Sequence, residues 1–429
     1  MYNLRGGFLI RPLTITLVLG CTGALLAGLE EAVPGISDWV PRALFPSHGE
    51  PQVAQVILGG IASSIMTVVS IVFAILLMTL TLASMQFSPR IIVSFASDRV
   101  TQWTLGIFLG TFSYCMAALP AARSLPRPFT PVIAVLGAMF LALTCVAWLL
   151  FFIHHISRAI NVNQIVDRIA SETEAMIDEI MPWPRAPHRV TPDESVRDLK
   201  WELPVSSELS GYIRFIDIKR LAALAKSYHI KIQVLRRVGH FVAQGVPFLM
   251  VSKADRVGPE ELAELRSTVD LGPTRTLQQD IEFGVLQIVD IALKAISPAV
   301  NDPSTAISCV DQLCRILIRV ASREPPESGV YDPPGVLRVI VLWPGFDRLL
   351  ESAFEQIRMY SKADVAVSLR MLRALGDVAT TTQDQEIHRL LADRANRIVA
   401  GCAERLGEHE LTEIRARLLA IHRLVGLPY

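Results

Sequence analysis

The first third of the chain consists largely of long apolar runs. Four runs come near or above the ~20 residues that an α-helix needs to cross the hydrocarbon core of a bilayer, and they cover residues 8–29, 53–85, 103–122 and 131–153. Each run predicts a membrane-spanning helix. Arg5 and Arg11 flank the first run, but it is long for a signal peptide and no clean small-residue cleavage site follows it. We therefore expect it to remain as the first span.

Beyond the fourth run the pattern becomes amphipathic. Apolar residues continue at three- and four-residue spacing as far as Ile180, now interleaved with charged residues, which predicts a helix that leaves the membrane and continues in water. The segment 181–192 contains four prolines and is typical of a linker. We expect a transmembrane domain at 1–153, followed by a helical extension and Pro-rich linker at 154–192.

The remaining residues carry two patterns. Alternating apolar and polar positions around turns at Gly239 and Gly245 predict a small β-rich module at 193–258. Amphipathic helical spacing, with one possible strand at 336–343, predicts a mainly helical cytoplasmic domain at 259–429. The expected fold class is an α-helical integral membrane protein with four transmembrane helices and a cytoplasmic α+β domain that contains a small β module and a helical bundle.

The composition agrees with a membrane protein. Of the 429 residues 51% are hydrophobic and 19% charged, and the mean hydropathy is +0.40, which is too apolar for a cytosolic enzyme of this length. The 41 basic and 41 acidic residues balance one another. No bulk charge therefore favours nucleic acid as a partner.

Motifs of enzymatic chemistry are missing from the sequence. It contains no GxxxxGKS/T, GxGxxG, HExxH or GxSxG pattern, and no CxxC pair among its six cysteines. We therefore expect no enzymatic activity, no catalytic residue, no cofactor and no metal site. The cores of the four apolar runs also lack acidic and basic residues, which argues against proton-coupled transport.

Basic residues near the ends of the runs predict the orientation of the chain. On one side lie Arg5, Arg11, Arg90, Arg99 and Arg158, and on the other Arg42, Arg123 and Arg127. Because the cytoplasmic side carries the excess of basic residues, we expect both termini in the cytoplasm.

Two short motifs point to a known family. They are MQFSPR at residues 85–90 and ALKAISPAVNDPSTA at residues 292–306. With four spans followed by a large cytoplasmic domain, the chain resembles a bacterial family of predicted four-span inner-membrane proteins that is catalogued as a domain of unknown function. The resemblance covers nearly the whole chain. It implies a multi-pass protein of the bacterial inner membrane and brings no activity with it.

The second run carries a stripe of small and hydroxyl-bearing residues. Steps of three and four place these residues on one face of a helix. The stripe consists of Gly60, Ser63, Thr67, Ser70, Ala74, Leu77, Thr81, Ser84 and Ser88. Such a face allows close helix packing, or it lines a hydrated path when repeated around an oligomer axis. Arg90 follows the stripe, either as an anchor in the headgroup zone or as a basic ring at a pore mouth.

The predicted cytoplasmic domain contains a second polar stripe and a turn. The stripe is made of Asp280, Gln287, Asp290 and Lys294, and the turn of Asn301, Asp302, Ser304 and Thr305. The stripe is either an ordinary solvated face or the lining of a hydrated vestibule or subunit contact. In the turn, an aspartate before Pro303 is typical of a helix cap, although a helix N-terminus also attracts anions.

These features predict an oligomeric inner-membrane channel or pore for ions or small polar solutes. Its lining would be the stripe of the second run, organised or gated by the cytoplasmic domain. The alternative is a non-conducting membrane scaffold or sensor whose cytoplasmic domain binds a ligand or partner. Expected partners are the lipid bilayer and further copies of the chain. The acidic residues of the first external loop, which favour cations slightly, are Glu30, Glu31, Asp38 and Glu50.

Overall fold

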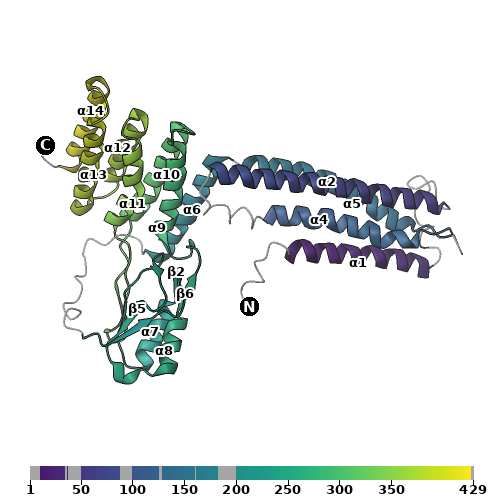
Figure 1. The fold of residues 1–429 in the computed structure, drawn as a ribbon, viewed down its shortest axis with the longest axis horizontal. Helices are drawn as coiled ribbons and strands as arrows, with labels where there is room; N and C mark the ends of the chain where they lie inside the picture. Colours follow the sequence, from purple (N-terminus) through teal and green to yellow (C-terminus); the bar gives the residue numbers. More distant parts are fainter. Residues whose placement is uncertain are drawn as a thin grey trace. The chain divides into compact units, whose positions relative to one another are not determined.

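The computed structural model describes residues 10–33, 36, 50–86, 99–124, 128–159, 161–181 and 200–426. The chain divides into two compact units, Met1–Asn161 and Val162–Tyr429. Figure 1 shows the long helices of the first unit and the mixture of helices and strands in the second.

Four long apolar helices make up the described part of the first unit. They are α1 (Ile10–Ala32), α2 (Pro51–Gln86), α4 (Arg99–Ala118) and α5 (Val132–Ala159), with a short 3-10 turn, η2 (Leu119–Ala121), after α4. The segments long and apolar enough to cross a membrane are Ile10–Ala32, Pro51–Thr79, Arg99–Ala121 and Val132–Arg158. The prediction of four helices of spanning length is confirmed.

Glycines bring α1 and α4 into close contact. A Cβ at Gly23 of α1 would lie 2.6 Å from the carbonyl oxygen of Tyr114, and a Cβ at Gly110 of α4 would lie 2.5 Å from Cδ1 of Leu19. Gly106, one turn before Gly110, meets α1 in the same way. Residues later in α4 contact residues later in α1, so the two helices run parallel. Small residues that let backbones approach are the usual basis of helix packing in membranes, where apolar burial gives little driving force.

The polar side chains of α4 are satisfied inside the first unit. Tyr114 donates from its hydroxyl to the carbonyl of Ala134 at 3.0 Å, and Trp148 donates from Nε1 to Oγ1 of Thr104 at 2.9 Å. Neither the hydrocarbon core of a membrane nor an apolar helix contact offers a hydrogen-bond partner. The Tyr114 hydroxyl and the Trp148 N–H therefore need these partners inside the unit. α4 contacts each of the other three helices and is the centre of the bundle.

The second unit begins with α6 (Val162–Ile180), which lies in the predicted amphipathic segment. Its apolar face packs against α9 (Ile281–Ala295) and α10 (Pro303–Ala321). The approach is close at Gly284 of α9, where an added Cβ would collide with Oγ1 of Thr173. α6 is therefore part of the core of the second unit.

Two small sheets form the β part of this unit. The five-stranded sheet has the order β1–β5–β3–β8–β7, and the three-stranded sheet the order β4–β2–β6. The strands are β1 (Leu203–Ser206), β2 (Gly211–Ile216), β3 (Ile232–Val234), β4 (Phe241–Val242), β5 (Pro247–Val251), β6 (Val269–Gly272), β7 (Gly329–Asp332) and β8 (Val336–Ile340). The short helices α7 (Ile218–Ser227) and α8 (Pro259–Ser267) cover them.

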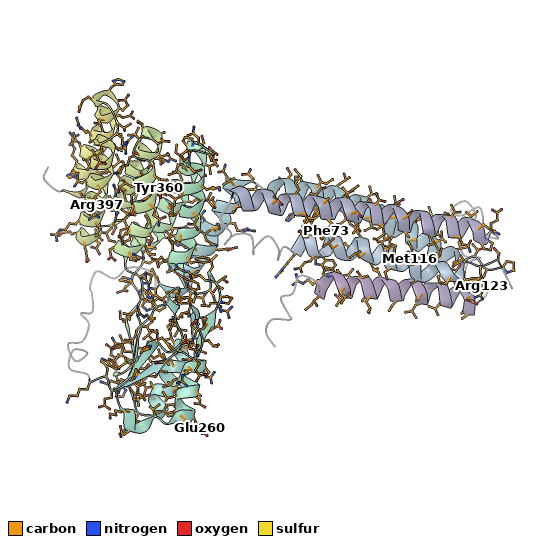
Figure 2. All side chains as sticks on the ribbon, in the orientation of Figure 1. Phe73, Met116, Arg123, Glu260, Tyr360 and Arg397 are labelled. Atoms are coloured by element: carbon orange, nitrogen blue, oxygen red, sulfur yellow. The ribbon has the colours of Figure 1, made fainter. Side chains whose placement is uncertain are left out.

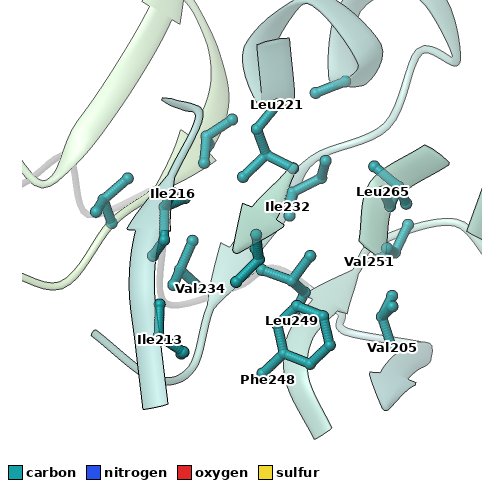
Figure 3. Packing of buried hydrophobic residues seen from close by; sticks show 14 of the residues in the cluster. Val205, Ile213, Ile216, Leu221, Ile232, Val234, Phe248, Leu249, Val251 and Leu265 are labelled. Carbon is teal, nitrogen blue, oxygen red and sulfur yellow. The ribbon is translucent and has the colours of Figure 1, made fainter. Parts of the chain in front are cut away.

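The sheets and both short helices share one apolar core. Figure 3 shows Ile213, Leu221 and Phe248 among its side chains. Strand β8 pairs in parallel with β3, with Ile232 opposite Val339, and it confirms the strand predicted at 336–343. Because β6, β7 and β8 follow residue 258, the sheets draw on residues from both sides of that predicted boundary.

The helical part continues with α11 (Phe346–Tyr360), α12 (Val365–Thr380), α13 (Gln385–Ala403) and α14 (Glu408–Val425). Helix α12 packs between α10 and α14, and α13 packs against α14. Four helices of this part start at an aspartate that accepts a backbone N–H, namely Asp280, Asp302, Asp364 and Asp384. Such caps satisfy amides that the first helical turn leaves without partners.

A buried carboxylate joins the β part to the helical part. The side chain of Glu282, in the first turn of α9, is 5% exposed. It accepts hydrogen bonds from Nη2 of Arg237, after β3, at 2.9 Å and from Nε of Arg348, on α11, at 2.7 Å. Ser352 donates to the same carboxylate at 2.9 Å, and Nη2 of Arg275 lies 3.6 Å from it. Three segments of the chain, besides α9 itself, therefore converge on one charge.

The charge of Glu282 is stabilised by these partners. Burial alone would raise the pKa of the Glu282 carboxyl, but the Arg237 guanidinium and the other donors outweigh burial and hold this pKa below its ordinary value of 4.5. A carboxyl pKa that folding lowers contributes stability above the unfolded value, and this contribution is lost as pH falls through the folded value. The contact therefore weakens only in acid.

Replacing Gly23 with alanine should destabilise the first unit, because the added methyl group meets the Tyr114 backbone, which has no rotamer to change. Overpacking of this kind costs about 1 to 3 kcal/mol. The control is Gly28→Ala on the same helix, where nothing lies within 4 Å of the added Cβ. The measurement is the thermal unfolding midpoint in detergent, and equal midpoints for the two variants would contradict the close contact.

Replacing Glu282 with glutamine should destabilise the second unit by about 3 to 5 kcal/mol, because it removes the buried charge that faces the half-buried arginines Arg237 and Arg275. Glu351→Gln is the matched control, because Glu351 pairs with the same Arg348 but is 52% exposed, and exposed pairs contribute about 1 kcal/mol or less. Urea unfolding followed by limited proteolysis measures both variants. The difference between wild type and Glu282→Gln should shrink below about pH 4.5; a constant difference down to pH 3 would rule out the charge as its cause.

Candidate functional site

The stripe on α2 lies on the surface of the first unit. Seven of its nine residues have described side chains, and all seven are exposed: Gly60, Ser63, Thr67, Ser70, Ala74, Leu77 and Thr81. Ser88 and Arg90 lie outside the described residues, as does the side chain of Ser84. The structure thus brings the seven together as one continuous outward face.

The opposite face of α2 makes the contacts within the chain. Ala54, Leu58 and Ala62 are buried against α4 and α5, and Ile65 and Val72 continue this buried row. Packing against the other described helices of the first unit therefore does not account for the small residues of the stripe. Contact with a second copy, with water or with lipid remains.

Each described stripe hydroxyl donates to the backbone of its own helix. The Ser63 hydroxyl donates to the carbonyl of Gly60 at 3.1 Å, and the Thr67 hydroxyl to that of Ser63 at 3.1 Å. Ser70 and Thr81 do the same with carbonyls four residues back, at 3.0 and 2.8 Å. These hydroxyls are satisfied without an external partner. What they offer outward is oxygen lone pairs, which accept from water or contact cations.

Acidic residues at the other end of the helices are partly engaged. Glu30 is 4% exposed, and both its carboxylate oxygens accept from the backbone N–H of Ile133, at 3.0 and 3.2 Å. Glu31 forms an ion pair with Arg123. The expected preference for cations counted both residues as free loop charges, and the structure removes this basis for it. Glu50 is exposed, and Asp38 lies outside the described residues.

The second polar stripe does not form one solvated face. Asp280 is 4% exposed, caps α9 through the N–H of Phe283 and accepts from Arg275 at 2.7 and 2.8 Å. Gln287 is 7% exposed. Asp290 is half-buried and Lys294 is exposed. Helix α9 is covered on most sides by α6, α10 and α11, so only its C-terminal end reaches solvent.

The turn between α9 and α10 is a capping structure. Asp302 accepts from the backbone N–H of Thr305 at 3.1 Å and from its hydroxyl at 2.6 Å, and Pro303 occupies the first turn of α10. The Thr305 hydroxyl lowers the pKa of the Asp302 carboxyl from its ordinary value. Asn301 has a φ of 50°, in the left-handed region that asparagine tolerates. Asn301 and Ser304 are exposed.

No metal centre is present among the residues that the structure describes. No group of three or more His, Cys, Asp or Glu side chains there is arranged to hold an ion. The six cysteines, all of them within this part of the chain, are free thiols.

Two features escaped the sequence analysis. The spacing of Gly106 and Gly110 is a GxxxG pattern, which signals a close helix contact in an apolar segment. The central role of Glu282 had no such signal, because its partners come from segments far apart along the chain.

Comparison with known proteins supports the resemblance stated above. The profile of the DUF2254 family, described as a predicted membrane protein, matches residues 5–377. Uncharacterized proteins of Mycobacterium bovis and Mycobacterium tuberculosis are each 32% identical over 345 residues, which are 79% of this chain and 66% of the relative. The chain thus aligns with somewhat less than two thirds of their length. No solved structure matches. The chain belongs to the DUF2254 family of predicted membrane proteins.

Proposed function

We propose that the protein is a homo-oligomeric channel or pore for ions or small polar solutes, with α2 facing the oligomer axis. The observation that carries this proposal is the exposure of all seven described stripe residues. A helix that uses its opposite face for packing within the protomer has the stripe available for the axis. The second unit would organise or gate the assembly.

The composition of the stripe separates it from surfaces that face lipid. Other helices expose large apolar side chains, such as Leu17 of α1 at 65% and Leu143 of α5 at 71%. Beside the stripe, α2 exposes Phe73, labelled in Figure 2, at 51%. Glycine, serine and threonine give lipid little to contact, but they suit a narrow path, where small side chains leave room and hydroxyl oxygens replace part of a hydration shell.

The proposal includes an orientation and a location. Among the described residues of the first unit, three arginines, Arg11, Arg99 and Arg158, lie near one end of the bundle, and one, Arg123, lies near the other. The positive-inside rule then places both termini in the cytoplasm of a bacterium, with the first unit in its inner membrane. Arg90 would stand at the cytoplasmic mouth.

A non-conducting scaffold is the second candidate. It is favoured by the hydrogen bonds of the stripe hydroxyls to their own backbone, because such hydroxyls need no water. In a scaffold the stripes of neighbouring copies would pack together directly, as small residues do at helix contacts in membranes. The two candidates therefore differ in whether the stripe contacts water or a neighbouring copy.

Cysteines placed in the stripe should distinguish the two. In a background without native cysteines, cysteine at Thr67 or Ser70 should react with a water-soluble thiol reagent and lower ion flux into liposomes. The control is Leu143→Cys, since Leu143 is 71% exposed on the protomer but apolar and on α5. It should face lipid and stay unreactive. Reaction at Leu143 alone, or no flux by the unmodified protein, would remove the pore and favour the scaffold.

Single cysteines should also test the orientation. A cysteine at Ser124, at the end opposite Arg99, should be labelled by a membrane-impermeant reagent added outside the cell. A cysteine at Asn161, after α5, should be labelled only in inside-out vesicles. The reverse pattern would overturn the proposed orientation while leaving the four helices in place.

A further inference from the structure

The two units are joined by a very short link. Helix α5 ends at Ala159 and α6 begins at Val162, so two residues separate them. The backbone N–H of Asn161 donates to the carbonyl of Arg158 at 3.0 Å. Because the units are contiguous in sequence, the chain passes from one to the other only here.

The helix after this link is built into the second unit. Its buried face consists of Ile165, Val166, Ile169, Ala170, Thr173, Met176 and Ile177. This face packs on α9 and α10, with the close contact at Gly284. The Pro-rich segment that the sequence marks as a linker comes after α6. That segment therefore does not separate α5 from α6.

Ion pairs hold the polar edge of α6 to α10. Three arginines spaced four residues apart face three acidic residues of α6. Arg315 and Arg319 belong to α10, and Arg323 follows its end. Arg315 donates to Asp167 at 2.9 Å and also pairs with Glu174, and Arg319 donates to Asp178 at 2.8 and 2.5 Å. Arg323 pairs with the same Asp178 at 2.5 Å. Hydrogen bonding from Arg319 lowers the pKa of the Asp178 carboxyl, so this acid is ionised at neutral pH.

The relative strength of these contacts decides how α6 behaves. Arg319 and Asp178 are 39% and 37% exposed, and exposed ion pairs contribute little to stability. The buried apolar face contributes more, because it removes several large apolar side chains from water. The ion pairs therefore set the register of α6 on α10, whereas the apolar face supplies most of its attachment. α6 moves with α9 and α10 as one body.

We propose that α6 is the rigid coupling element through which the second unit acts on the fourth span, α5. A change in the packing of α9 and α10 shifts α6, and the two-residue link passes that shift to the end of α5. The expected effect of this coupling on solute flux rests on the proposed channel. The expected effect on the structure of α5 does not depend on conduction.

A flexible insertion tests the transmission in the full-length protein. Insertion of Gly-Ser-Gly-Ser after Asn161 should change flux into liposomes by about tenfold, within the range of typical coupling between sites. The same insertion after Ala186, in the Pro-rich segment beyond α6, is the matched control and should leave flux within about twofold of wild type. Equal effects of both insertions, or no effect of the first in a conducting protein, would overturn the coupling.

Hydrogen exchange provides a readout that does not depend on conduction. In the full-length protein, Arg319→Glu should speed amide exchange in α6 and in residues 153–159 of α5 by about tenfold. Arg397→Glu is the control, because Arg397, labelled in Figure 2, forms an exposed pair with Asp393 of its own helix. It should change neither segment. Asp178→Asn provides the same test if Arg319→Glu does not fold.

Combining the two changes completes the test. With the insertion after Asn161 present, Arg319→Glu should still speed exchange in α6 but should no longer affect α5. The proposal would be overturned if Arg319→Glu left amide exchange in α5 unchanged without the insertion. It would also be overturned if Arg319→Glu still changed exchange in α5 with the insertion present. If the wild-type protein passes no solute, the channel is excluded, and the exchange result alone decides whether α6 couples the second unit to α5.

Discussion

A carboxylate that folding removes from water must find its counter-charges within the protein, and in the second unit this requirement falls on Glu282. Its partners come from the loop after β3, from the segment before α9 and from α11. None of these segments can shift alone without uncovering a buried charge. The sheets and the helical part are therefore bound to each other by electrostatics as well as by apolar contact. This is why a region with two sequence patterns folds as one compact unit.

Features fixed by local spacing could be predicted from the sequence, and features fixed by distant partners could not. The four apolar helices, α6 and the strand β8 follow from periodicities within a dozen residues. The neighbour of β8 does not, because Val339 meets Ile232 more than a hundred residues earlier in the chain. Nothing in either strand specifies the other. The register comes from the shared core that both strands cover.

The same limit applies to the α2 stripe and to the charges near it. Periodicity identifies which residues share a face, but it does not say what lies opposite that face. Exposure in the first unit excludes one neighbour, the other described helices of that unit, and leaves lipid, water and a second copy. For Glu30 the error had the same origin. A carboxylate near the end of a span was counted as a loop charge, although it accepts the N–H of Ile133 at the start of another helix.

The parallel contact of α1 with α4 has a consequence for biosynthesis. The glycine face of α1 at Gly23 fits the backbone of a helix that begins at Arg99. If α1 inserts into a membrane, a chain made from its N-terminus places it there before α4, its partner, has been synthesised. The glycines of α1 then face lipid while α2 is made. The first unit therefore cannot be completed helix by helix, because the main contact of α1 forms only with the third apolar helix.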